Sequence, residues 1–329
     1  MRPFAHVRAT SLAQAVEATA GGDGARFLAG GTTLFDLMKL EVETPSTLVD
    51  ITALPDLHEI KVGRRGLVVG ALARMADVAD HDEVRSRYPA LSESLSKAAS
   101  QQLRNMATVG GNLLQRTRCG YFRGGAPYAC NKRQPGSGCS AIGGVDRGLA
   151  LFGTSDACIA NYPGDWAVAL VAFDAEIEVL GPRGLRRLPA EALHREPGTT
   201  PHIETVLDPG DLITRIHVPA SPALRASTYH KIRDRASYAF ALTSAAVGVD
   251  VDRGRIREVR IALGGVGARP MRVRDAEAVL RDRPYTRALA LEAGDIALRG
   301  ARTSPHNAFR VPLGVQTVAD AIGIAMERA

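Results

Sequence analysis

The chain has 329 residues, 45% of them hydrophobic and 23% charged, with a formal net charge of +6. This composition is that of a globular protein and excludes extended disorder, while the length allows two or three domains. The basic excess is small and lies mostly in one stretch, which argues against the broad basic face of a nucleic-acid binder. No apolar run approaches the ~20 residues that span a bilayer, and residues 1–20 lack the apolar core of a secretory signal. We therefore expect no membrane span and no export signal on this chain.

The N-terminal segment predicts a helix and then a unit of strand, glycine turn, helix and strand. Ser11 can cap a helix that continues to Ala20 and ends at Gly21-Gly22. The unit that follows is expected as a short buried strand at 25–29, the turn Gly30-Gly31-Thr32-Thr33, a helix at 34–40 and a strand at 47–51.

This glycine turn has two interpretations. Glycines let the backbone approach a ligand, and the free N–H groups of the turn and the helix start can bind a diphosphate. A tight turn without a ligand is the simpler interpretation of Gly30-Gly31 alone, because glycine pairs commonly mark turns.

A second glycine turn, Gly110-Gly111-Asn112, follows a hairpin at 59–69 and a helical region at 75–100. Two such turns could hold one long diphosphate-bearing ligand from two sides. The turns do not match the dinucleotide fingerprint G-x-G-x-x-G, so the sequence does not support a Rossmann domain.

The stretch that follows is basic and holds every cysteine of the protein. Residues 94–145 contain no Asp or Glu but seven basic side chains, which predicts a positive local field suited to an anion. The basic residues are Lys97, Arg104, Arg116, Arg118, Arg123, Lys132 and Arg133. The cysteines are Cys119, Cys130, Cys139 and Cys158.

The cysteine spacing, C-x10-C-x8-C-x18-C, leaves several interpretations open. It lacks the C-x2-C unit of structural zinc sites. Two disulfides in one of three pairings, four separate buried thiols, and an iron–sulfur cluster held by four thiolates are all compatible with it. The connecting loop is rich in Gly and Pro and poor in apolar residues, so a cross-linking centre would be needed to order it.

The second half of the chain predicts strands with helices packed on them. The segment Pro163-Gly164-Asp165 opens a helix at 166–173, and strands follow at 175–180 and 212–218. Further strands at 229–233, 239–251 and 256–265 predict a separate antiparallel sheet, with helices on one face at 274–281, 287–298 and 315–328.

Several segments together resemble the flavoprotein subunits of molybdenum hydroxylases, the xanthine dehydrogenase family. They are FLAGGTT (27–33), RNMATVGGN (104–112), PGD (163–165), GDLI (210–213) and HK (230–231). The segment IALGGV (261–266) with Arg269-Pro270 resembles the C-terminal domain of these subunits, so the resemblance covers essentially the whole chain. The cysteine insert resembles fewer members of the family. It is similar to that of the FAD subunit of periplasmic aldehyde oxidoreductase and, more distantly, to that of 4-hydroxybenzoyl-CoA reductase.

The resemblance implies roles for individual residues. Residues around the two glycine turns would surround the diphosphate and ribityl parts of FAD: Leu28, Ala29, Gly30, Gly31, Thr32, Thr33 and Leu34 in the first, and Ala107, Thr108, Gly110, Gly111 and Asn112 in the second. Asp165 would hold ribityl hydroxyls, and Lys231 would lie near the isoalloxazine ring with Leu212 and Ile213, where its charge can stabilise reduced flavin. A solvated strand residue is the alternative for Lys231. The four cysteines would bind a [4Fe-4S] cluster.

The implied fold is α+β. It would combine a two-subdomain FAD-binding domain of the vanillyl-alcohol-oxidase (PCMH) type with a C-terminal α+β domain that contains an antiparallel sheet. The FAD-binding domain would cover residues 1–222, with subdomains at about 1–57 and 58–222 and the cysteine insert at about 114–160, and the C-terminal domain residues 223–329.

The implied function is electron transfer within a heterotrimeric aldehyde oxidoreductase. A large subunit with a molybdenum cofactor would oxidise aldehyde to carboxylate, a small subunit with [2Fe-2S] clusters would relay electrons, and the FAD of this chain would pass them to an external acceptor. No catalytic residue need lie on this chain. Location in the periplasm would follow from co-export with a signal-bearing partner, with the cytoplasm as the alternative.

Three other functions stay open. The chain could be the FAD subunit of a molybdenum hydroxylase with an aromatic or CoA-thioester substrate. It could be a structural or regulatory module that binds zinc or contains disulfides. It could also be a stand-alone flavin oxidase or reductase, although no acid–base constellation stands beside the glycine turns in the sequence.

Overall fold

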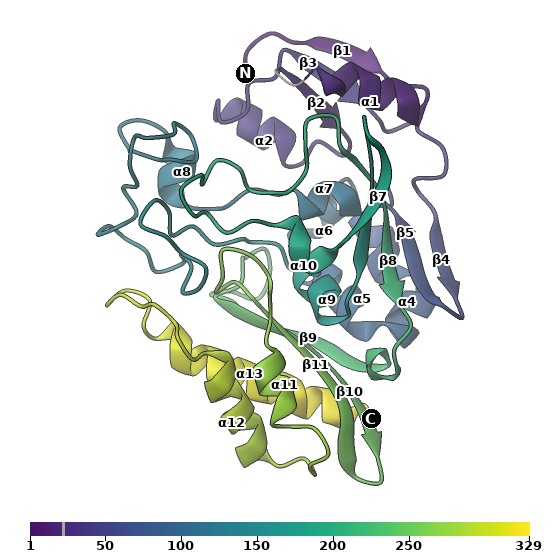
Figure 1. Ribbon diagram of the computed structural model, residues 1–329, viewed down its shortest axis with the longest axis vertical. Helices are drawn as coiled ribbons and strands as arrows, with labels where there is room; N and C mark the ends of the chain where they lie inside the picture. The colour runs from purple at the N-terminus through teal and green to yellow at the C-terminus, as the bar shows by residue number, and fades with distance from the viewer. Residues whose placement is uncertain (22–23) are drawn as a thin grey trace.

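The computed structural model describes residues 1–21 and 24–329. Three sheets follow one another along the chain and from top to bottom of the molecule in Figure 1. The expected helix ends at Gly21, and Gly22 of the predicted stop lies outside the described residues. The predicted domain boundaries near residues 57 and 222 fall between the sheets and stay a prediction.

The first layer is a parallel sheet of order β1-β3-β2 with two helices. Its elements are β1 (Ala5–Arg8), α1 (Leu12–Ala20), β2 (Ala25–Leu28), α2 (Leu34–Lys39) and β3 (Thr47–Asp50). Ser11 caps α1 as predicted, because its hydroxyl accepts a hydrogen bond from the Gln14 N–H. The expectation that β2 is buried is wrong: it is the edge strand of this sheet, and most of its residues are only half-buried.

The second sheet is antiparallel, of order β4-β5-β8-β6-β7. Its strands are β4 (Ile60–Gly63), β5 (Gly66–Gly70), β6 (Glu176–Gly181), β7 (Gly184–Pro189) and β8 (Leu212–Pro219). The sequence analysis missed β7, whose exposed side chains give no apolar alternation.

The predicted helical region at 75–100 is three helices rather than one. They are α3 (Met75–Asp80), α4 (Asp82–Arg87) and α5 (Pro89–Ser96). The extended backbone at His81 separates the first two helices, and Pro89 starts the third, where a missing N–H costs nothing. Two short helices, α6 (Gln101–Arg104) and α7 (Val109–Leu113), lead to the insert.

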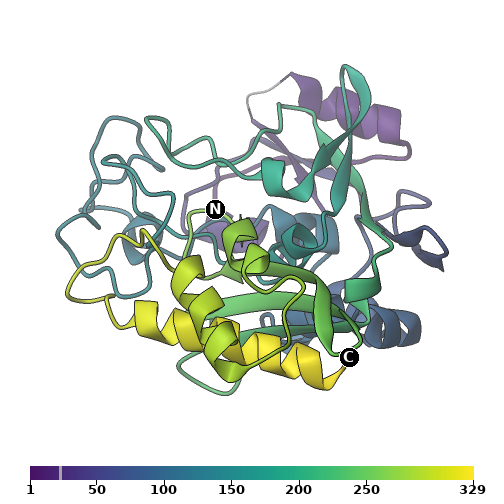
Figure 2. The same cartoon turned by 60° about the horizontal axis from the view of Figure 1, so that its bottom comes forward.

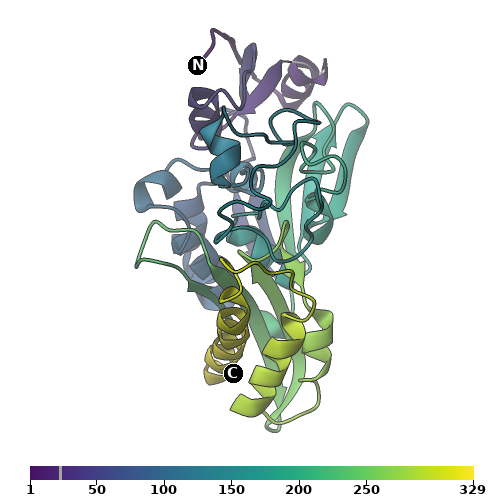
Figure 3. The ribbon, with the colours of Figure 1, turned by 90° about the vertical axis from the view of Figure 1, so that its left-hand side faces the viewer.

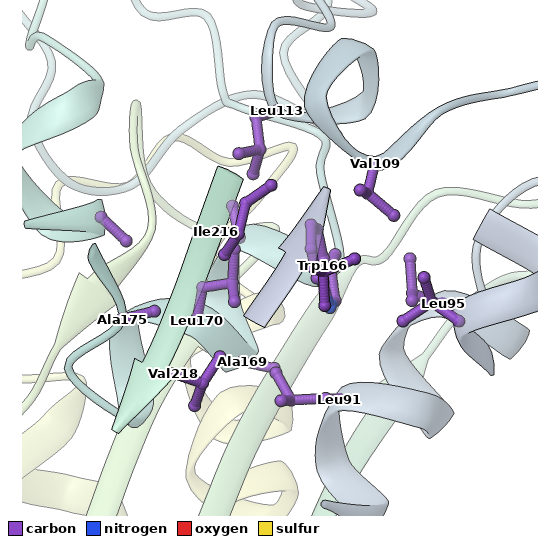
Figure 4. Packing of buried hydrophobic residues seen from close by; sticks show 14 of the residues in the cluster. Leu91, Leu95, Val109, Leu113, Trp166, Ala169, Leu170, Ala175, Ile216 and Val218 are labelled. Carbon is purple, nitrogen blue, oxygen red and sulfur yellow. The ribbon is translucent and has the colours of Figure 1, made fainter. Parts of the chain in front are cut away.

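The core of the second layer is built around α9 (Trp166–Ala172), every residue of which is buried. Figure 4 shows Trp166 and Leu170 beside Ile216 of β8, with Leu91 and Leu95 of α5 on the other side. The turn that begins α9 is therefore fixed by packing, and with it the position of Asp165.

The cysteine insert has almost no regular structure among residues 114–160. It contains one helix, α8 (Gly120–Gly124), and its long loops lie between the N-terminal layer and the C-terminal helices, as Figure 3 shows. The rest of this segment consists of turns and loops, and the expected need for a cross-linking centre stays a prediction.

The third layer is an antiparallel sheet of order β12-β11-β10-β9, as predicted. Its strands are β9 (Ala226–Ile232), β10 (Thr243–Asp252), β11 (Arg255–Gly264) and β12 (Met271–Arg272). Helices α11 (Arg274–Ala278), α12 (Arg287–Ala297) and α13 (Arg310–Glu327) cover one face, which Figure 2 brings forward. Helix α13 begins five residues earlier than expected. Helices α5 and α9 of the second layer pack on the other face, so this sheet connects the C-terminal helices with the second layer.

The α+β fold with a C-terminal antiparallel sheet is thus confirmed. Two further short helices, α10 (Ala190–Leu193) and η1 (Pro222–Leu224), complete the described elements. Among the described residues, no helix combines the length and apolar character that crossing a bilayer requires.

Candidate cofactor site

A cleft of about 720 Å³ is lined by both glycine turns and by residues 208–213. All the predicted flavin residues line it except Leu28, Asp165 and Lys231. The residues that line it are Ala29, Gly30, Gly31, Thr32, Thr33, Leu34, Ala107, Thr108, Gly110, Gly111, Asn112, Leu212 and Ile213. The two turns, about 80 residues apart in sequence, therefore meet at one site, as predicted.

The first turn presents free backbone donors to this cleft. Among the described residues, none accepts a hydrogen bond from the backbone N–H groups of residues 30–34, whereas the Phe35 N–H donates to the Gly31 carbonyl. Gly31 has φ +70°, a conformation that glycine adopts without strain. A run of free N–H groups at the start of α2 is suited to a diphosphate.

The two glycines of the second turn both line the cleft but differ in their surroundings. The Gly110 N–H donates to the Ala71 carbonyl at 2.9 Å, so it is not free, and a Cβ there would lie 2.8 Å from that of Ala71. Gly111 is exposed, and a Cβ on it would meet only the Thr108 hydroxyl, at 3.0 Å. That hydroxyl caps α7 by accepting from the Gly111 N–H.

The two glycine turns also touch each other. A Cβ on Gly30 would lie 1.9 Å from the Met106 carbonyl oxygen, so Gly30 is required by the close approach of the two turns rather than by a ligand. The Asn112 Oδ1 atom is buried and has no hydrogen-bond partner. It is available to a donor group on a ligand.

The carbonyl at the end of α7 is held by two buried side chains that the sequence analysis did not single out. The Leu113 oxygen accepts from the Tyr162 hydroxyl at 3.0 Å and from His194 Nε2 at 2.8 Å. Because a carbonyl can only accept, Nε2 of His194 carries the proton, and the buried Nδ1 is left without a partner. Burial lowers the pKa of His194 to about 4.

Asp165 and Lys231 lie together below the cleft rather than in its wall. The Lys231 ammonium is 2.8 Å from Asp165 Oδ2, and both side chains are buried. The Tyr229 hydroxyl donates to the other carboxylate oxygen at 2.7 Å. Burial raises the pKa of Asp165, although Lys231 acts in the opposite direction. Lys231 is therefore not a solvated strand residue.

The predicted positive field is largely compensated by carboxylates from distant segments. Arg116 contacts Glu43 and Glu204, and Lys132 also contacts Glu204. Asp36 of α2 contacts Arg118 and Arg123. The fold thus brings acidic residues to this stretch that the local sequence does not contain, and they reduce the predicted positive field.

The four cysteines are gathered in one apolar cluster, and none forms a disulfide. Cys130 and Cys139 form an isolated antiparallel β-bridge between two loop segments. Phe122, Leu149 and Ala160 belong to the same cluster as the thiols. A hydrogen bond from Cys158 lowers the pKa of Cys139 to about 6 and raises that of Cys158. Burial raises the pKa of Cys119.

The described residues include no group of three or more His, Cys, Asp or Glu side chains at the spacing that one metal ion requires. In an iron–sulfur cluster each thiolate can bind a different iron, so the ligands surround a volume instead of one point. Four free thiols gathered in one apolar cluster of side chains fit such a group.

The cleft fits FAD. The free N–H groups of the first turn suit a diphosphate, Asn112 supplies an acceptor, and the apolar Leu212 and Ile213 provide a surface for a ring system. The fold and the cleft together are those expected of a flavoprotein.

Comparison with known proteins identifies the family. Residues 2–221 match the FAD binding domain in molybdopterin dehydrogenase, and residues 227–321 match the CO dehydrogenase flavoprotein C-terminal domain. The chain belongs to the family of FAD-binding medium subunits of molybdenum hydroxylases, and it binds FAD. The predicted family is therefore confirmed.

Individual relatives cover most or all of the chain. The aldehyde oxidoreductase FAD-binding subunit PaoB of Escherichia coli K12 is 43% identical over 100% of both chains. The glyceraldehyde dehydrogenase medium chain of Sulfolobus acidocaldarius is 28% identical over 83% of this chain and 79% of its own. In fold, the chain resembles a chain of carbon monoxide dehydrogenase from Hydrogenophaga pseudoflava, with a TM-score of 0.78, 24% identity and coverage of 100% and 99% of the two chains.

Proposed function

We propose that this chain is the FAD-binding electron-transfer subunit of a heterotrimeric molybdenum-dependent aldehyde oxidoreductase. Aldehyde is oxidised to carboxylate on a molybdenum subunit, and a [2Fe-2S] subunit relays the electrons. This chain receives them and delivers them to an external acceptor. Its own residues bind the flavin and bring the two redox sites together, and none acts on the aldehyde.

One observation carries the choice of aldehyde oxidoreductase within the family. The relative that is similar over the full length of both chains, at 43% identity, is named an aldehyde oxidoreductase FAD-binding subunit. An alignment that spans both chains from end to end includes the insert, the element that resembles the aldehyde oxidoreductase subunits.

The insert supports a [4Fe-4S] cluster with Cys119, Cys130, Cys139 and Cys158 as ligands. All four thiols are free and gathered in one apolar cluster of side chains. An iron–sulfur cluster supplies one-electron transfer when bound. Arg116, Arg118, Arg123 and Lys132 are held in place by Glu43, Glu204 and Asp36, and the excess of cations favours thiolate ligands.

We also propose roles toward the flavin for Asp165 and Lys231, although neither residue lines the cleft. Packing of α9 fixes Asp165, and Asp165 holds the Lys231 ammonium at 2.8 Å. In the proposal, this buried cation stabilises the negative charge of reduced flavin. We also propose that the complex acts in the periplasm after export with a signal-bearing partner, which cell fractionation tests.

Purification of the co-expressed subunits tests the proposal. The chain is expected to co-purify with an iron–sulfur subunit and a molybdenum subunit, and the complex should reduce an added acceptor when aldehyde is supplied. The isolated chain should contain flavin but oxidise no aldehyde. Aldehyde turnover by this chain alone, or the absence of both partner subunits from the co-expressed preparation, would contradict the proposal.

A further inference from the structure

The FAD cleft has one wall that neither glycine turn provides. Arg116 and Lys132 of the insert line this side, together with Glu43 from the segment after α2 and Glu204 from the loop before β8. Only three residues separate Arg116 from Asn112 of the second glycine turn. The insert therefore reaches the cleft directly.

These four side chains form a connected ion-pair network, here called the clamp. Arg116 contacts Glu43 Oε1 at 2.7 Å and Glu204 Oε1 at 3.1 Å, and Lys132 contacts the same Glu204 oxygen at 3.0 Å. The Lys132 ammonium also donates to the Pro201 carbonyl at 2.9 Å. The Arg116 guanidinium stacks on the ring of Phe122 at 4.7 Å, inside the insert.

The clamp is protected from solvent. The exposed fractions of its side chains lie between 10% and 20%. Burial alone would raise the pKa of Glu204, but Arg116 and Lys132 hold it below its usual value. Partly buried pairs are screened less than surface pairs, and the loss of one partner leaves a charge that water reaches poorly.

We propose that the clamp makes the insert an integral wall of the FAD cleft, so that flavin binding and ordering of the cysteine loop are coupled through Glu43 and Glu204. Arg116 lies three residues before Cys119, and Lys132 two residues after Cys130. The same side chains that close the cleft therefore set the positions of two cysteines. Glu43 and Glu204 are positioning residues for both cofactors. The part of the proposal that concerns the cluster rests on the proposed function.

Coupling of this kind is reciprocal. If the ordered insert increases the affinity for FAD by a given factor, bound FAD increases the stability of the ordered insert by the same factor. A merely structural ion pair would affect stability but would not make one site respond to the other.

The test uses Glu204→Gln in the full chain, which keeps the size of the side chain but removes its charge. Glu43→Gln is the second variant, in case the first fails to fold. The matched control is Asp234→Asn, because Asp234 contacts Arg147 of the insert at 2.8 Å on the side away from the FAD cleft. FAD affinity is measured by titration of flavin-free protein, and order in the insert by limited proteolysis at residues 116–160 with and without FAD.

In the wild type, FAD should slow cleavage of the insert. In Glu204→Gln, FAD affinity should fall by about tenfold and this protection should disappear. Asp234→Asn should retain the wild-type FAD affinity and the protection of the insert by FAD. Wild-type affinity and protection in Glu204→Gln, or in Glu43→Gln if the first does not fold, would overturn the proposal, as would an equal loss in Asp234→Asn. A wild-type chain without iron would reject the cluster but leave this coupling testable with FAD.

Discussion

At the scale of single residues, the glycines of the site differ in what they do. Gly30 and Gly110 are required because the backbone approaches another segment too closely for a Cβ. A Cβ on Gly111 would meet only the Thr108 hydroxyl, at 3.0 Å, and no backbone atom. Of these three glycines, Gly111 is therefore the one at which a larger side chain can block the ligand without disrupting the protein.

Gly111→Val should give folded protein without bound FAD, because the added side chain enters the cleft. The cost to folding should be limited to the Thr108 cap, about 1 kcal/mol. The control is Gly63→Val, in an exposed hairpin where a Cβ meets nothing closer than 3.9 Å. Flavin content per chain and the thermal midpoint are measured together. Normal flavin content in Gly111→Val would reject the assignment of this turn to FAD.

At this scale the sequence predicted most of the residues that line the cleft, because they occur in short contiguous motifs, and their contacts with FAD stay a prediction. It could not show that the Gly110 N–H is already used by Ala71, because that contact joins segments almost 40 residues apart. It also missed His194, a lone histidine with no motif around it, whose role depends on Leu113 and Tyr162.

At the scale of elements, the helices and strands were predicted where a local sequence signal marks them. Ser11 fixed the start of α1, and β11 was recognised because its first half alternates between exposed and buried residues, whereas residues 243–249 of β10 are buried on both faces. The break at His81 was missed because the apolar pattern on both sides is helical, and β7 was missed because an exposed edge strand carries no such pattern.

The contact of His194 with α7 gives an element-scale prediction with a defined pH window. The ring is neutral in the folded protein, with its pKa lowered to about 4, and the unfolded chain takes up this proton near pH 6.5. Between these values the unfolded state binds more protons, so this contribution to stability is lost as pH falls from about 6.5 toward 4.

Unfolding by urea measures this effect in His194→Gln, which cannot titrate. The wild type should lose up to about 3 kcal/mol more than the variant between pH 6.5 and pH 4. His306→Gln, at an exposed histidine without a side-chain hydrogen bond, should follow the wild type. Parallel pH profiles for the wild type and His194→Gln would show that His194 is not held neutral.

At the scale of the whole molecule, topology brings together charges that no local window of sequence contains. Arg116 contacts Glu43, 73 residues before it, and Glu204, 88 residues after it. Counting charges along residues 94–145 showed the basic side chains but not the carboxylates that the fold brings to them. The meeting of the two glycine turns was predicted because both have recognisable motifs, whereas Glu43 and Glu204 lie in no motif.

The same topology makes the insert depend on its own cross-link. Its loops contain one short helix, and their apolar core consists largely of the four cysteines with Phe122, Ala141, Leu149 and Ala160. An iron–sulfur centre would therefore supply much of the free energy that orders this segment. Cys139→Ser should lose iron and become sensitive to protease over residues 116–160.

The decisive measurement is iron and acid-labile sulfide per chain, with electron paramagnetic resonance after reduction. About four of each in the wild type is expected for a [4Fe-4S] cluster. Ser140→Ala, on the same loop, should retain iron and acid-labile sulfide and should resist protease. Because the clamp joins this loop to the cleft, Cys139→Ser should also bind FAD more weakly. Stoichiometric zinc, or two disulfides without iron, would refute the cluster, and an iron-free Cys139→Ser with a fully protected loop would show that the insert is ordered without it.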